Sequence, residues 1–64
     1  MYILDVKPKH VESVVSFLDN FKIEFDFELD LYSRDGRFEI ESLVDYNTAR
    51  NFVIRLEKVD REVL

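Results

Sequence analysis

Residues 22–31 read KIEFDFELDL, a stretch in which charged and apolar side chains alternate at every position. Alternation with a period of two predicts a β-strand with one apolar and one polar face. The apolar face must be covered by a second layer, so this strand decides the architecture around it. After the first position every charged residue is acidic, and the polar face therefore carries Glu24, Asp26, Glu28 and Asp30.

A β-hairpin is predicted to follow. Asp35-Gly36 is typical of a two-residue turn, because both positions favour residues that accept a positive φ. The strand before the turn then covers residues 22–33, and the strand after it covers residues 37–44. A one-residue slip would place an acid against the apolar face, which disfavours other registers. The expected pairs are Leu31 with Ile40, Asp30 with Glu41, Tyr32 with Glu39, and Glu28 with Leu43.

Two helices are predicted on either side of this hairpin. A short strand over residues 2–7 is followed by Pro8, which suits the first position of a helix over residues 8–20. Its apolar stripe comprises Val11, Val14, Val15, Leu18 and Phe21. The second helix is expected to be capped by Asp45 or Asn47 and to run to near the C-terminus. Its buried stripe comprises Ala49, Phe52, Val53, Leu56, Val59 and Val63.

The order β-α-β-β-α predicts an α+β fold in a single domain over residues 1–64. Each helix has one apolar stripe, so the simplest arrangement is two layers, with three strands and both helices on one face. This order resembles a ferredoxin-like fold that lacks its last strand. The expected spatial order of the strands is 1-3-2, with 1-2-3 as the alternative. Both orders leave open edges that can pair with another chain, and Tyr2–Val6 is the candidate edge for a homodimer.

Composition narrows the function classes. The chain has no cysteine, so it has no disulfide framework and no thiolate zinc site. We expect a cytoplasmic protein, in the host cytoplasm if the source is viral, because neither a signal peptide nor a membrane-spanning apolar run is visible. Residues 22–45 contain eight acids and three bases, which accounts for the whole net charge of −5. Direct binding to nucleic acid or to an anionic membrane is therefore not expected.

Catalysis and metal binding have little support in the sequence. Asp26, Glu28 and Asp30 lie in an extended segment, whereas calcium loops place their acids in a turn with a glycine. A Mg²⁺ or Ca²⁺ site shared by Asp30 and Glu41 is the alternative that the hairpin register leaves open. His10 is the single histidine and is expected at the surface. We predict no catalytic residue, no metal ligand and no cofactor.

The acidic polar face is the strongest functional signal. Its carboxylates would recur at about 6.8 Å along a strand and about 4.8 Å across the ladder, a spacing that can imitate phosphates. We expect a small acidic binding protein, of the kind that phages or mobile elements use as inhibitors, which occupies the basic nucleic-acid site of a partner protein. The alternatives are a self-associating interaction module and a face that serves only solubility. The predicted binding residues are Glu24, Asp26, Glu28, Asp30, Glu39 and Glu41, with Tyr32 and Leu43 as apolar anchors.

Glu41-Ser42-Leu43 resembles the Glu-Ser-Ile segment of phage-type uracil-DNA glycosylase inhibitors, which resemble DNA to their target. The resemblance covers three residues and serves only as an example of how such an acidic surface is used. The chain departs from that pattern in one respect, because the predicted register points Ser42 toward the core.

Overall fold

The computed structural model describes residues 1–62 of the chain. Strand β1 (Tyr2–Val6) leads through a 3₁₀ turn, η1 (Pro8–His10), into helix α1 (Val11–Asn20). Strands β2 (Asp26–Leu29) and β3 (Gly36–Ile40) form a hairpin, and helix α2 (Leu43–Glu62) follows. The order β-α-β-β-α and the α+β class are confirmed.

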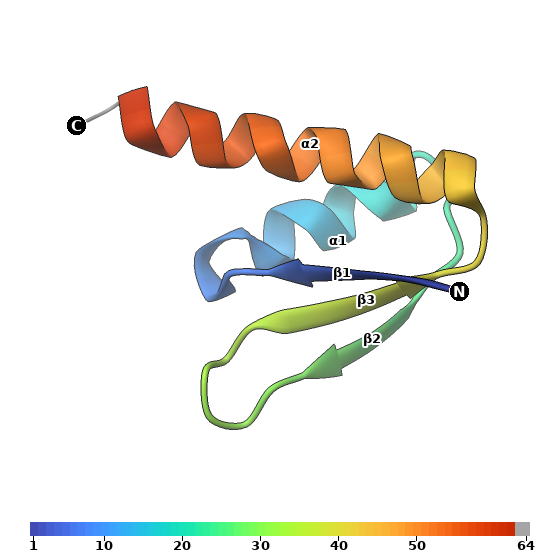
Figure 1. The fold of residues 1–64 in the computed structure, drawn as a ribbon, viewed down its shortest axis with the longest axis horizontal. Coiled ribbons are helices and arrows are strands. Elements are labelled where there is room, and N and C mark those ends of the chain that lie inside the picture. Colours follow the sequence, from blue (N-terminus) through green and yellow to red (C-terminus); the bar gives the residue numbers. More distant parts are fainter. Residues whose placement is uncertain (63–64) are drawn as a thin grey trace.

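The sheet has the order β1-β3-β2, and β3 is antiparallel to both neighbours. The expected 1-3-2 order is therefore confirmed. Both helices lie on the same side of the sheet (Figure 1). This arrangement leaves the opposite face of the sheet without a covering layer in the described part of the chain.

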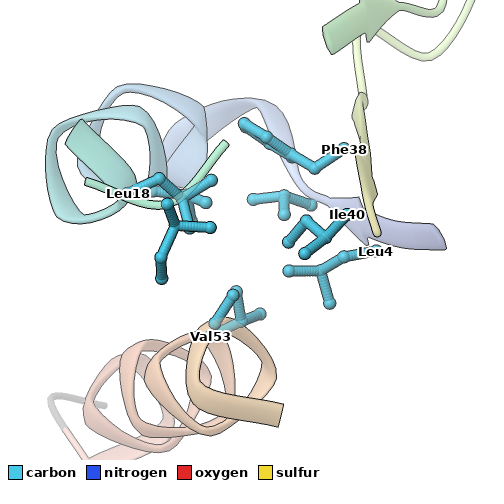
Figure 2. Close-up of a cluster of buried hydrophobic side chains, with 9 residues drawn as sticks. Leu4, Leu18, Phe38, Ile40 and Val53 are labelled. Atoms are coloured by element: carbon cyan, nitrogen blue, oxygen red, sulfur yellow. The ribbon is translucent and has the colours of Figure 1, made fainter. Parts of the chain in front are cut away.

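The core lies between the helices and the sheet. Nine buried side chains form one cluster, to which β2 contributes none (Figure 2). Phe27 and Leu29 of β2 face this layer but remain 44% and 41% exposed, because β2 is the edge strand and lies beside the cluster. The cluster comprises Leu4, Val6, Val14, Leu18, Ile23, Phe38, Ile40, Ala49 and Val53.

The hairpin differs from its prediction. The turn is not at Asp35-Gly36: residues 31–34 form a four-residue loop, which is closed by a bond of 2.9 Å from Asp30 N–H to the carbonyl of Asp35. Arg34 supplies the left-handed residue of this loop, with a φ of 67°. Strands β2 and β3 are shorter than predicted. The predicted pair of Leu31 with Ile40 does not form, because Leu31 lies in the loop, and Phe27 lies opposite Phe38.

Gly36 has a different role from the one predicted. It adopts no positive φ, and it is the first residue of β3. A Cβ atom at this position would lie 2.8 Å from Cε1 of Phe27 and 2.9 Å from Cγ2 of Val11. The strand therefore uses the absence of a side chain, which lets α1 and β2 approach β3 closely.

Two apolar residues that were predicted in the buried stripes of the helices are exposed in the structure. Helix α1 ends in a Schellman motif: Ile23 N–H donates to the carbonyl of Leu18 at 2.9 Å, and Lys22 has a φ of 55°. Phe21 lies at the C-cap and is 62% exposed, so its place in the buried stripe was wrong. Val59 of α2 is likewise exposed. Val63 lies outside the described residues.

Ser42 caps α2, in place of Asp45 or Asn47. Its Oγ accepts a hydrogen bond of 3.3 Å from Asp45 N–H, and the side chain is exposed rather than turned to the core. The cap begins the helix at Leu43 and ends the extended chain after Ile40. Ser42 lies three positions before Asp45, which is the spacing of an N-cap. This signal was missed because the predicted hairpin register placed Ser42 inside a strand.

His10 is buried, which contradicts its predicted surface position. Its Nε2 lies 2.7 Å from Oδ2 of Asp60, and Lys9 Nζ lies 2.8 Å from the same oxygen. These contacts join η1 to the last turns of α2. The hydrogen bond from Lys9, and then the one from His10, hold the pKa of Asp60 below its usual value against the opposing effect of burial.

A candidate acidic interface

The outer face of the sheet carries two rows of side chains that run across the three strands. In the first row Glu39 of β3 lies between Ile3 of β1 and Asp26 of β2. In the second row Arg37 lies between Asp5 and Glu28. All of these side chains except Glu39 are exposed, and Glu39 is half-buried. The two rows therefore differ in charge, one being acidic and the other mixed.

Four carboxylates gather at the acidic end of this face. Glu24, Asp26, Glu39 and Glu41 line one shallow hollow together with Ile23 and Phe25, and no basic residue lines it. We call these four residues the acidic cluster. Asp26 and Glu39 come from opposed positions of the ladder, while Glu24 lies two residues before β2 and Glu41 directly follows β3. The hairpin thus places side chains from two separate segments around one hollow.

The other end of the face is partly neutralised. Arg37 Nε lies 3.7 Å from Oδ1 of Asp5, and Glu28 lies opposite Arg37 in the ladder. An exposed pair at this distance contributes little to stability, but it reduces the local negative field. Sequence reasoning missed this arrangement because the predicted register placed Arg37 at the turn, opposite Arg34.

Asp30 follows the end of β2 and lines a hollow together with the outward-facing Asp5, Glu28 and Arg37. It begins the hairpin loop, and its Oδ1 accepts hydrogen bonds from Tyr32 N–H at 2.8 Å and from Ser33 N–H at 3.0 Å. These two backbone bonds, the Ser33 bond first, hold the pKa of Asp30 below its usual value. The side chain is a loop-forming residue of the Asx-turn type. Its predicted pairing with Glu41 is wrong, because position 30 bonds to position 35.

The two predicted anchors lie at opposite ends of the hairpin. Tyr32 is 99% exposed at the tip of the loop, where it lines a second hollow with Asp5, Glu28 and Arg37. Leu43 is half-exposed in the first turn of α2, two residues after Glu41. Their predicted pairings with Glu39 and Glu28 are corrected by the register, so neither lies within the sheet face itself. Tyr32 lies at the neutralised end, whereas Leu43 is not among the residues that line the hollow of the acidic cluster.

Within residues 1–62, no three histidine, aspartate or glutamate side chains are placed so that they could hold a metal ion. The cation site proposed for Asp30 and Glu41 lacks a basis, because the two residues lie at opposite ends of the hairpin. In the same residues, no helix combines the length and apolar character that a membrane span requires.

Comparisons with protein-family models, with curated proteins and with solved structures each gave no match.

Proposed function

We propose that this chain is a small acidic binding protein whose outer sheet face occupies the basic nucleic-acid site of a partner protein. The observation that carries the proposal is the acidic cluster, four carboxylates around one hollow without a basic neighbour in its lining. The protein would act by occlusion, without catalysis, in the manner of phage or mobile-element inhibitors. Its place of action would be the cytoplasm, where such partners handle DNA or RNA.

The spacing of the cluster suits a groove built for phosphates. Neighbouring strands lie about 4.8 Å apart, and outward side chains recur about every 6.8 Å along one strand. Asp26 and Glu39 provide the first spacing, and Glu24 and Glu41, which lie just outside the two strands, add two further carboxylates around the same hollow. A basic groove would meet several negative groups at once. Association would be accelerated by long-range attraction and weakened by salt.

The cluster also carries an energetic cost that a face serving only solubility need not have. Like charges that oppose each other across a ladder destabilise a sheet by roughly 0.2–1 kcal/mol. The row of Asp5, Arg37 and Glu28 shows that this sheet accommodates an outward-facing base. The sheet nevertheless keeps Asp26 opposite Glu39 with no base beside them, which supports a functional role for this uncompensated charge.

A matched pair of charge reversals tests this proposal. The face variant carries Asp26→Lys and Glu41→Lys, and the control variant carries Glu12→Lys and Asp19→Lys on the exposed surface of α1. Both variants change the net charge by the same amount. The wild-type chain and the two variants are immobilised separately and exposed to a lysate of the native cell. Bound proteins are then eluted with a DNA duplex.

We expect the wild type and the control variant to retain a nucleic-acid-binding protein that duplex DNA elutes. The face variant should retain at least tenfold less of this partner protein, equivalent to a loss of about 1.4 kcal/mol or more of binding free energy. Equal capture by all three chains, with circular dichroism confirming that each is folded, would contradict the proposal. Elution by polyglutamate but not by the duplex would also contradict it, because it would indicate a non-specific basic surface.

A further inference from the structure

The second surface of interest is the outer edge of β1. Within residues 1–62, β1 pairs only with β3, so the backbone groups along its other edge have no strand partner. We propose that this edge pairs with β1 of a second copy, antiparallel about a two-fold axis at Leu4, to form a continuous six-stranded sheet. This inference is independent of the partner that the acidic cluster binds.

The charges of the two edge strands favour β1 over β2 as the self-pairing edge. On β2 both outward-facing residues, Asp26 and Glu28, are acidic, so two copies of β2 would oppose acids to acids in every register that matches the faces. On β1 the outward-facing residues are Ile3 and Asp5, and the opposite side of the strand is apolar throughout. Strand β1 is therefore the edge whose side chains are compatible with a second copy.

The pattern of β1 also selects a register. Centred on Leu4, the pairing places Tyr2 opposite Val6 of the second copy and Ile3 opposite Asp5 of the second copy, so that all five strand residues are paired. A shift by one residue would set core-facing side chains against outward-facing ones. A shift by two toward the C-terminus would place the two copies of Asp5 directly opposite each other. A shift by two toward the N-terminus would leave Val6 without a strand residue opposite it, so the register centred on Leu4 is the one that pairs all five residues and avoids these faults.

Helix α2 provides an apolar residue at the same side of the molecule. The rings of Tyr2 and Tyr46 lie 5.5 Å apart, which places the first part of α2 over β1. Phe52 stacks on Phe17 of α1 at 4.1 Å, so the opposite side of α2 faces away from α1. Ile54 follows two residues later, about 200° around the helix, and it is 46% exposed. Ile54 is therefore exposed on the side of α2 that is turned away from α1, and the proposed dimer would bring the second copy to this side.

Sedimentation equilibrium tests the dimer over about a hundredfold range of concentration, because a small interface of this kind associates weakly. We expect a reversible monomer–dimer equilibrium. Ile54→Lys should weaken dimerisation at least tenfold. The matched control is Val59→Lys, a substitution of similar exposure about 140° around α2 from Ile54, and it should leave dimerisation unchanged. A monomer at every concentration would overturn the proposal. So would species that grow beyond a dimer, because they would indicate open-ended pairing of β1 with β2.

Disulfide cross-linking tests the register, because the chain has no cysteine of its own. Ile3→Cys and Asp5→Cys are prepared as separate single variants and oxidised alone and mixed. The register centred on Leu4 places position 3 of one copy opposite position 5 of the other, so the mixture should give cross-linked heterodimers. Each variant alone pairs only diagonally, beyond the usual reach of a disulfide. Cross-linking in the mixture that is no greater than in the separate samples would overturn the proposal.

Discussion

Asp26 lies directly opposite Glu39 in the β2–β3 ladder, and the neighbouring outward-facing pair joins Glu28 to Arg37. The same two strands thus carry one repulsive and one attractive pair, in equivalent positions of the same face. Comparing the two pairs therefore separates the energetic cost of opposed acids from the overall stability of the sheet.

Reversing one charge in each pair should change stability in opposite directions. Glu39→Lys replaces repulsion by attraction and should raise the free energy of unfolding by roughly 0.2–1 kcal/mol, while Glu28→Lys should lower it by a similar amount. Urea denaturation at low ionic strength measures both changes. The difference between the variants should shrink at high salt, because exposed charges are then screened. Shifts of the same sign in both variants would refute this reading of the ladder.

The contact between His10 and Asp60 makes stability depend on pH in acid. The pKa of Asp60 is lowered in the folded protein, chiefly by the hydrogen bond from Lys9 and then by the one from His10. A carboxyl group with a lowered folded pKa stabilises the protein above its unfolded pKa, about 3.9, and loses this effect as the pH falls through the folded value. Asp60→Asn should therefore reduce stability at neutral pH and flatten the fall of stability in acid.

Thermal unfolding between pH 7 and pH 2 measures this effect. The control is Asp19→Asn on the exposed surface of α1, which should follow the wild-type curve. An Asp60→Asn curve parallel to the wild-type curve over the whole range would show that the carboxylate contributes nothing through its ionisation.

The end of α1 offers a stabilising substitution. Lys22 adopts a φ of 55° at the position where Schellman motifs usually carry glycine. Lys22→Gly should raise the free energy of unfolding by roughly 0.5–1 kcal/mol, because glycine adopts this conformation without the steric cost of a Cβ atom. Calorimetry should show a higher Tm. Lys58→Gly, within the exposed part of α2, is the control and should lower Tm, since glycine costs about 1 kcal/mol inside a helix. A lower Tm for Lys22→Gly would contradict this account of the helix end.

The faces of the sheet were predictable from sequence because side-chain alternation does not depend on the exact register. The observed hairpin pairs Asp26 with Glu39, whereas the predicted turn placed Glu39 opposite Tyr32. The two registers differ by an even number of residues, so Asp26, Glu28 and Glu39 stay on the outer face in both. The acidic character of this face followed from composition and alternation alone.

The register itself was not predictable, because glycine can be required for two different reasons. Asp35-Gly36 has the composition of a tight turn, but Gly36 is needed for space beside Phe27 and Val11. Arg34, whose side chain gives no such signal, takes the left-handed conformation instead. The positions of Asp30 and Arg37 were misjudged as a direct consequence.

The contact of His10 with Asp60 joins residues 50 positions apart. Local patterns report burial of apolar residues, whereas a buried histidine is recognised only once its partner is known. Long-range polar contacts of this kind require the packing of η1 against α2.

In the proposed function the acidic cluster competes with nucleic acid for the same site on a partner protein. The most direct test mixes the captured partner with a fluorescent DNA duplex and adds the wild-type chain, the face variant or the control variant. Fluorescence anisotropy then follows release of the duplex. The wild type and the Glu12→Lys, Asp19→Lys control should displace the duplex, at lower protein concentrations when the salt is lower, and the Asp26→Lys, Glu41→Lys variant should not. A ternary complex in which the duplex stays bound beside the wild-type chain would contradict the account.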